Sequence, residues 1–154
     1  MQLGNILKAD AVKSIASCTS KKRLFHDLGE LAEASYDLNA SDVIEALLKR
    51  EDLGPTGVGQ GIALPHARMP EANNVVGLFL RLEKPLDFEA VDRQPVDLVF
   101  ALIAPEDAGV DHLKALALVS RTLRDQAVCT KLRANSETNT LHAILTELEA
   151  SQAA

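Results

Sequence analysis

"PVDLVFALIAP", residues 95–105, is an apolar run of strand length in a chain of 154 residues. Its hydrophobic residues alternate poorly with polar ones, which predicts a strand covered on both faces. "NVVGLFLRL", residues 74–82, has the same character. The polar link between them, "EKPLDFEAVDRQ", suits a loop that joins neighbouring strands. We therefore expect a buried sheet with other elements packed on both of its sides.

Segments with helical periodicity precede and follow these strands. Residues 20–38 predict a helix that Ser20 can cap, with an apolar face made by Leu24, Leu28 and Leu31. Residues 39–52 predict a second helix, ended by Gly54 and Pro55, whose inner face holds Ile44, Leu47 and Leu48. Three more helices are expected over residues 109–125, 127–135 and 136–150. In the first of these, one stripe holds His112, Leu116, Val119 and Leu123.

Two shorter segments complete the expected sheet. "MQLGNIL", at the start, suits a short turn of helix, and "AVKSI", residues 11–15, suits an edge strand. "GIALP", residues 61–65, is a further apolar run of strand length. The order of one strand, two helices, three strands and three helices predicts an α/β protein. Its architecture would be a three-layer α/β/α sandwich, with a central mixed β-sheet flanked by helices and a single domain over residues 1–154.

Composition limits the classes of function. The net charge of -6 and the aromatic content of 3% argue against a nucleic-acid platform, which needs basic grooves and stacking rings. Cys18 and Cys129 form no CxxC pair, so we expect free thiols in a reducing compartment. No signal peptide is recognisable, and no apolar run approaches the roughly 20 residues of a membrane helix. We expect a cytoplasmic protein without membrane insertion.

"TGVGQGIALPHAR", residues 56–68, places three glycines, Gly57, Gly59 and Gly61, shortly before a histidine. Glycine-rich backbone can converge on a phosphate. The P-loop pattern fails here because Gln60 and Gly61 replace its lysine and hydroxyl residue. The dinucleotide pattern fails because Ile62 replaces its third glycine, and because the loop follows a helix and leads into a strand. A nucleotide-binding module therefore remains only an alternative of another class.

The histidine offers a second reading of the same stretch. Pro65 restricts the backbone and gives His66 a stiff mount at the end of the strand. If the backbone stays extended, Leu64, His66 and Arg68 point to one side. A neutral imidazole, with an ordinary pKa of about 6.5, can accept a phosphoryl group as a labile P–N bond. The flexible backbone of Gly57, Gly59 and Gly61 near the ring, and a nearby guanidinium, would support that group. The residues alone leave open whether His66 does this or is a hydrogen-bonded polar residue beside a glycine turn.

His112 is a second candidate, because it lies in the first turn of a predicted helix. The N-terminal end of a helix disfavours a charged imidazole, so His112 should stay neutral and could act as a hydrogen-bond partner. The alternative is a partly buried histidine at the end of an apolar stripe. His26 and His142 look like surface or boundary positions without a role. No HxxxH or HxH spacing is present, so we expect no metal site.

"REDLGPTGVGQGIALPHAR", residues 50–68, resembles the EIIA domain of the fructose/mannitol type in the bacterial phosphoenolpyruvate-dependent phosphotransferase system. Residues 85–125 are similar to the second half of that family. The resemblance covers the chain from about Leu3 to the last helix, and its nearest branch is the nitrogen-regulatory one. It implies an α/β/α fold, in agreement with the periodicity.

The resemblance also implies roles. His66 would be the phosphoryl acceptor and His112 would contact the phosphoryl group. Arg50 would balance phosphate charge, and Thr56 opens the glycine loop. Arg68 matches the family less well.

The partners are implied in the same way. The donor would be a phosphohistidine on an HPr- or NPr-type carrier, and no metal or other cofactor is needed. The phosphorylation state would control binding to regulatory targets, which in this branch include potassium transport and sensor kinases. A sugar-specific EIIA component that passes phosphate to an EIIB domain is the alternative within the family.

Overall fold

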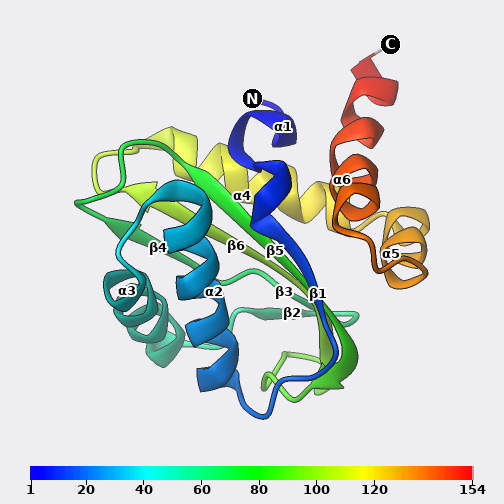
Figure 1. Cartoon of the computed structure of the whole chain (residues 1–154), viewed down its shortest axis with the longest axis horizontal. Helices are drawn as coiled ribbons and strands as arrows, with labels where there is room; N and C mark the ends of the chain where they lie inside the picture. The colour runs from blue at the N-terminus through cyan, green and yellow to red at the C-terminus, as the bar shows by residue number, and fades with distance from the viewer. Residues whose placement is uncertain (154) are drawn as a thin grey trace.

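The computed structural model describes residues 1–153, with side chains over residues 1–146. Within this range the strands form a six-stranded mixed sheet with the order β1-β5-β6-β3-β2, and β4 pairs with β6 as well (Figure 1). The strands are β1 Val12–Ile15, β2 Gly57–Gly59, β3 Ile62–Ala63, β4 His66–Met69, β5 Val76–Leu86 and β6 Val96–Pro105. β5 and β6 run antiparallel, whereas β1 is parallel to β5, and β3 and β4 are parallel to β6.

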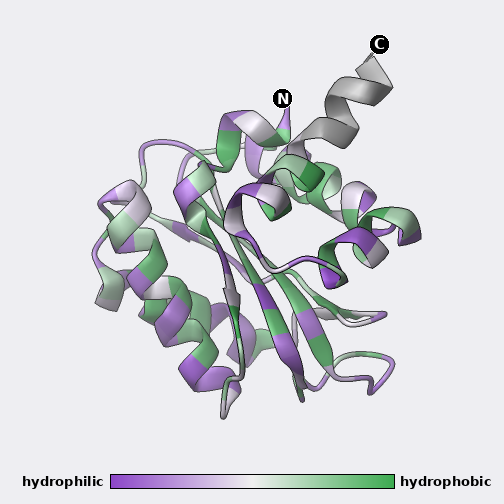
Figure 2. Cartoon of the chain, turned by 45° about the vertical axis from the view of Figure 1, so that its right-hand side comes forward, coloured by the Kyte–Doolittle hydropathy of each residue, from purple (hydrophilic) through white to green (hydrophobic). Residues whose placement is uncertain are grey.

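The helices lie in two layers around this sheet. α2 Lys21–Tyr36 and α3 Ala40–Leu53 pack together on one side. α4 Val110–Leu123, α5 Gln126–Arg133 and α6 Thr138–Ala153 lie on the other, and Figure 2 shows the sheet between the two groups. A short α1 Leu3–Ile6 and a 3-10 turn, Ala9–Ala11, precede β1. The predicted α/β/α arrangement is therefore confirmed.

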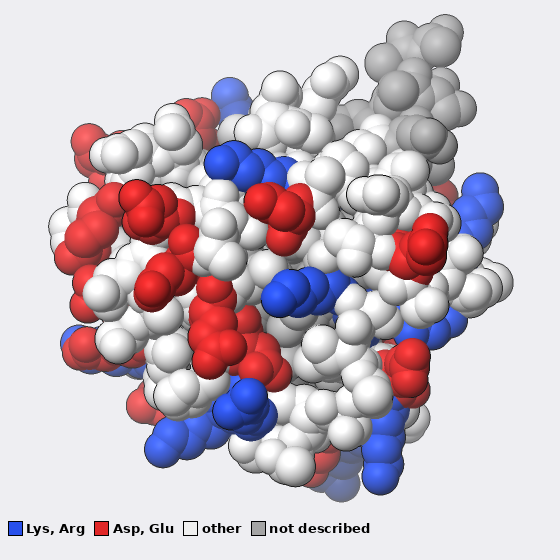
Figure 3. Space-filling view, in the orientation of Figure 1, with Lys and Arg blue, Asp and Glu red and all other residues white. Residues whose placement is uncertain are grey.

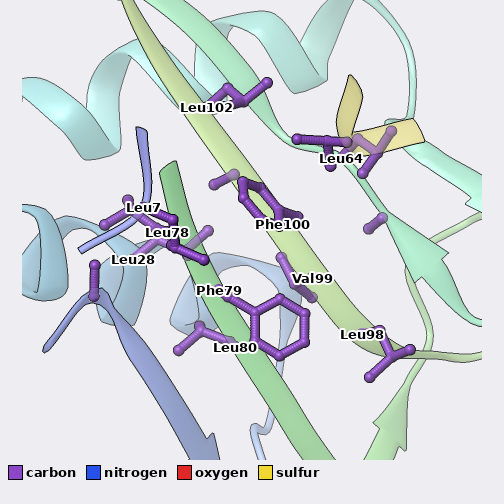
Figure 4. Packing of buried hydrophobic residues seen from close by; sticks show 14 of the residues in the cluster. Leu7, Leu28, Leu64, Leu78, Phe79, Leu80, Leu98, Val99, Phe100 and Leu102 are labelled. Atoms are coloured by element: carbon purple, nitrogen blue, oxygen red, sulfur yellow. The ribbon is translucent and has the colours of Figure 1, made fainter. Parts of the chain in front are cut away.

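The core fills the space between these layers. β5 and β6 are buried over most of their length, as their weak alternation predicts. Phe79 and Phe100, on opposite strands, place their ring centroids 6.2 Å apart. Figure 4 shows them among aliphatic side chains from both strands and from other elements, including Leu7, Leu28 and Leu64. Aliphatic side chains therefore make up most of the hydrophobic core.

Three sequence predictions need correction. The strand expected over residues 61–65 ends at Ala63, because Pro65 has no N–H to donate and the Leu64 N–H turns to the Thr56 carbonyl instead. His66 consequently begins a new strand, β4, rather than ending the old one. The inner face of α3 is also different: Val43 and Leu47 are buried, and Ile44 is only half-buried, packed where α2 has Gly29.

The loop predicted over residues 83–94 is shorter than expected. β5 continues to Leu86, with a register shift between Arg81 and Leu86. None of the described helices combines the length and the apolar composition that crossing a membrane requires.

Candidate active site

His66 is fixed where β4 starts on the edge of β6. It pairs in register with Leu102, and the Pro65 carbonyl accepts the Leu102 N–H at 2.9 Å. The half-buried ring places its Nδ1 2.9 Å from the Leu64 carbonyl oxygen. A carbonyl can only accept a hydrogen bond, so Nδ1 carries the proton of the neutral ring. The lone pair of the neutral imidazole is then on Nε2.

Arg50 meets the other nitrogen of this ring. Its Nε–H points to His66 Nε2 at 3.4 Å, a long contact that leaves Nε2 weakly engaged. The guanidinium is steadied by a bond from NH1 to the Gly54 carbonyl at 3.0 Å. Burial, together with the charge of Arg50, lowers the pKa of His66 below its ordinary value, although the Leu64 carbonyl opposes the shift. The ring is therefore neutral and nucleophilic at neutral pH.

His112 lies in the first turn of α4 and is only 6% exposed. Arg68 donates from Nε to His112 Nδ1 at 3.0 Å, so the proton of this neutral ring is on Nε2. That buried Nε2–H has no hydrogen-bond partner among the described residues. Burial, and then the neighbouring His66 and Arg68, lower the pKa of His112 to about 4. His112 is thus a neutral donor whose Nε2–H is unpaired in the described part of the chain.

Arg68 also braces the segment that leads into α4. Its NH1 donates to the Glu106 carbonyl at 3.2 Å and its NH2 to the Gly109 carbonyl at 3.1 Å. Three contacts from one guanidinium therefore tie β4 to the start of α4. They place His112 and keep its Nδ1 as an acceptor.

The two imidazoles lie together in one cavity. Their ring centroids are 5.5 Å apart and their planes are inclined at 67°. The cavity, of about 600 Å³, is lined by Asp42, Glu45, Ala46, Lys49, Arg50, Leu53, His66, Ala67, Arg68, Met69, Pro70, Glu71, Glu106 and His112. A larger cavity of about 720 Å³ near α1 has no histidine in its lining. One nucleophilic nitrogen, one free N–H donor and two guanidinium groups thus share a small space.

Such a set suits the transfer of an anionic group. The family description "Phosphoenolpyruvate-dependent sugar phosphotransferase system, EIIA 2" matches residues 5–148 of the chain. The chain belongs to this EIIA family.

Similar proteins place this EIIA near the nitrogen-regulatory branch. A "Nitrogen regulatory protein" of Bradyrhizobium diazoefficiens is 44% identical over 145 residues, which are 94% of this chain and 95% of that protein. One of Escherichia coli strain K12 is 42% identical over 150 residues, 97% and 92% of the two chains. The crystal structure of the nitrogen regulatory protein IIA-Ntr from Neisseria meningitidis matches with a TM-score of 0.85 and 38% identity, over 93% of this chain and 98% of that one. The resemblance seen in the sequence is confirmed, and this EIIA is a component of the phosphotransferase system.

The glycines of the motif lie apart from the cavity of this EIIA. Gly57 and Gly59 belong to β2, and with Gly61 they form its turn into β3; none of the three lines the cavity. The amide of Gln60, at the tip of this turn, already donates to Asp92 Oδ2 at 2.8 Å. A carboxylate at the tip disfavours a nucleotide phosphate there. The structure thus places Arg50 and His112 beside the His66 ring, and the three glycines in a turn outside the cavity lining.

Thr56 is buried and does not line the cavity. Its amide and its hydroxyl both donate to the carboxylate of Glu51, at 2.9 and 2.6 Å. Glu51, in the last turn of α3, is also paired with Lys21 of α2 at 2.7 Å. Sequence reasoning missed Glu51 and Lys21, because charged residues in a helix are ordinarily at the surface. The only sequence signal was the position of Glu51 directly after Arg50.

Proposed function

We propose that Nε2 of His66 accepts a phosphoryl group from a phosphohistidine on an HPr- or NPr-type carrier. The observation that carries this proposal is the Nδ1–H of His66 held on the Leu64 carbonyl, which leaves the Nε2 lone pair in the cavity. The P–N bond of the donor breaks and its nitrogen keeps the electron pair, while a P–N bond forms to Nε2. The proton on His66 Nδ1 stays where it is, and the positive charge that the ring gains is stabilised by the Leu64 carbonyl.

The rest of the cavity would stabilise the transferred group. Phosphoryl transfer depends mainly on alignment and on stabilising charge at the equatorial oxygens. The unused Nε2–H of His112 and the guanidinium of Arg50 are both suited to donate to such oxygens. The N-terminal end of α4 adds a favourable field for an anion. His112 stays neutral as it does so, since its pKa is about 4.

We further infer that phosphorylation serves as a signal. Relatives of this EIIA are named nitrogen regulatory proteins. A phosphoryl group adds about -1.5 to -2 charges at neutral pH. That charge would appear beside exposed apolar residues, among them Leu53, and would weaken a partner docked there by desolvation. We propose that this exchange takes place in the cytoplasm.

The test is to incubate the protein with phosphoenolpyruvate, Enzyme I and an HPr-type carrier, and to measure its intact mass. The proposal expects the addition of one acid-labile phosphoryl group that is absent in His66→Ala. Two-dimensional ¹⁵N spectra of the phosphorylated protein should place it on Nε2. Phosphorylation that persists in His66→Ala, or none in the wild type, would overturn the proposal.

Onward transfer to an EIIB protein is a second candidate, because the matched family is described as a sugar phosphotransferase system. The same phosphorylated protein separates the two functions. Loss of the label to an added fructose- or mannitol-type EIIB domain supports the sugar pathway. Retention of the label, with a regulatory target captured by only one of the two forms, supports the signalling role.

A further inference from the structure

Glu51 is a buried carboxylate at an unfavourable place. The residue is 9% exposed and lies in the last turn of α3, where the helix dipole presents its negative end. Burial of a carboxylate is strongly unfavourable unless well-placed partners compensate the loss of hydration. Replacing such a pair by apolar residues is often neutral or stabilising, so stability alone is a weak reason for it.

Both oxygens of the Glu51 carboxylate are engaged. Oε1 accepts from the Thr56 hydroxyl at 2.6 Å, and Oε2 accepts from the Thr56 amide at 2.9 Å. Oε2 also meets the Lys21 ammonium at 2.7 Å, and that ammonium lies 4.6 Å from the centre of the Phe88 ring. These contacts join α2, the end of α3 and the segment that enters β2.

The segment that enters β2 also positions the hydrogen-bond partner of His66 Nδ1. The Thr56 carbonyl accepts the Leu64 amide at 2.9 Å. The Leu64 carbonyl in turn holds His66 Nδ1 at 2.9 Å. The position of Thr56 therefore determines where the carbonyl that fixes the tautomer of His66 lies.

The end of α3 and the residues that follow it also position Arg50, which contacts His66 Nε2. Arg50 precedes Glu51 in the helix, and its NH1 donates to the Gly54 carbonyl at 3.0 Å. The Gly54 amide closes the turn on the Glu51 carbonyl at 3.1 Å. The contact of Nε2 thus comes from the turn of residues 50–56, and the contact of Nδ1 depends on that turn through the bond between Leu64 and Thr56. The Glu51 carboxylate ties this turn together.

We propose that Glu51 is a positioning residue for phosphoryl transfer. With Lys21 and Thr56 it locks the turn of residues 50–56, and through that turn it holds His66 as the Nδ1–H tautomer with Nε2 facing Arg50. This inference rests on the proposed function of His66 as acceptor. It assigns a role to a buried ion pair that touches neither the ring nor the phosphoryl group.

Glu51→Gln tests the proposal, with Asp52→Asn as the matched control. Asp52 is exposed, lies in the same turn and makes the same change of charge. We expect Glu51→Gln to lower the single-turnover rate of phosphoryl acceptance at saturating carrier by about tenfold or more, since misplacement by about 1 Å can cost a hundredfold. We expect Asp52→Asn to react at the wild-type rate.

The second readout needs no phosphate donor. The ring ¹⁵N shifts of His66 in the unphosphorylated protein, above its pKa, should show the Nδ1–H tautomer in the wild type and a mixture of tautomers in Glu51→Gln. His142 is an internal control, because its Nε2 contacts the Leu7 carbonyl in another part of the fold. If Glu51 had a purely structural role, Glu51→Gln would lower the unfolding temperature and leave the His66 tautomer of the folded protein unchanged.

Thr56→Val and Thr56→Ser keep the test decisive if Glu51→Gln does not fold. Valine removes the hydroxyl donor at nearly constant volume, so it should reproduce the slow transfer and the mixed tautomer. Serine keeps the hydroxyl and should restore both. Wild-type rate and tautomer in Thr56→Val or in Glu51→Gln overturn this inference and leave the proposed function intact. Absence of phosphorylation in the wild type would overturn the proposed function itself.

Discussion

His112 provides the hydrogen-bond donor in the cavity, and its removal tests how much a single N–H contributes. A hydrogen bond to a charged group contributes about 1.5–3 kcal/mol, which corresponds to roughly a ten- to hundredfold change in rate. We predict that His112→Ala slows phosphoryl acceptance by about this factor. A rapid-quench single-turnover measurement with phosphorylated carrier checks it. His26→Ala, on α2, should react like the wild type; equal rates for both variants would contradict the assigned role.

The same residue should make folding stability depend on pH. Burial lowers the pKa of His112 in the folded protein to about 4, below the ordinary 6.5. Between these values the unfolded chain binds a proton that the folded protein does not, so the free energy of unfolding falls as the pH falls from about 6.5 to about 4. Above about 6.5 this contribution is constant. We predict a flatter profile for His112→Gln in urea titrations at several pH values, and parallel profiles would refute it.

The proximity of these candidate residues was predictable from the sequence, but their tautomers were not. His66, His112 and Arg50 were expected near one another, and the structure brings them together with Arg68. Which nitrogen carries each proton depends on contacts with the Leu64 carbonyl and with a guanidinium 44 positions away in the sequence. Glu51 was missed for a related reason, since composition does not reveal that a charged helix residue is buried.

At the scale of elements, the turn from β2 to β3 is the most constrained part of the glycine motif. Gly61 has φ +81°, and a Cβ there would lie 2.6 Å from a nitrogen of Arg133 and 2.8 Å from Asp97 Oδ1. Arg133 and Asp97 form an ion pair at 2.8 Å, so neither can move away without loss. The glycine is needed for this close approach of backbone and ion pair, away from the histidines.

We predict that Gly61→Ala lowers the free energy of unfolding by about 1–3 kcal/mol through backbone strain and the crowded ion pair. Chemical denaturation at neutral pH measures the change. Phosphoryl acceptance by the folded variant should remain within about twofold of the wild type, because Gly61 is outside the cavity. A large kinetic defect in Gly61→Ala without loss of stability would contradict this prediction and show that Gly61 acts in phosphoryl transfer.

The long elements were predictable, as were the short α1 and β1, but β2 and β4 were not. Ser20 caps α2 as expected, accepting the Arg23 amide at 3.0 Å, and the apolar runs of β5 and β6 indicated the central strands. β2 and β4 have three and four residues, too few for a periodic pattern to be recognised. β4 nevertheless carries both His66 and Arg68. β4, which holds two of the four principal side chains of the cavity, was therefore among the elements that the sequence pattern could not predict.

Over the whole molecule, charge and apolar surface are distributed unevenly. Figure 3 shows acidic side chains gathered over α2 and α3, in keeping with the net charge of -6. The histidine cavity shares part of this acidic surface, since Asp42 and Glu45 of α3 line it, but large apolar residues are also exposed around it. Leu53, which lines the cavity, is 84% exposed, and Val110 and Leu113, beside His112, are 61% and 63% exposed. Exposed apolar side chains around a reactive group suit the docking of a protein donor.

Leu53→Asp tests this docking role against Val91→Asp, whose side chain is 78% exposed in the loop between β5 and β6. A carboxylate in place of an apolar contact should weaken the encounter with the carrier and leave the aligned histidines unchanged. We predict that Leu53→Asp raises the KM for the phosphorylated carrier by about tenfold with little change in kcat, the signature of lost uniform binding. Val91→Asp should change neither constant. If Leu53→Asp lowered kcat at unchanged KM, the leucine would act on the geometry of transfer, and the carrier would have to approach His66 from another side.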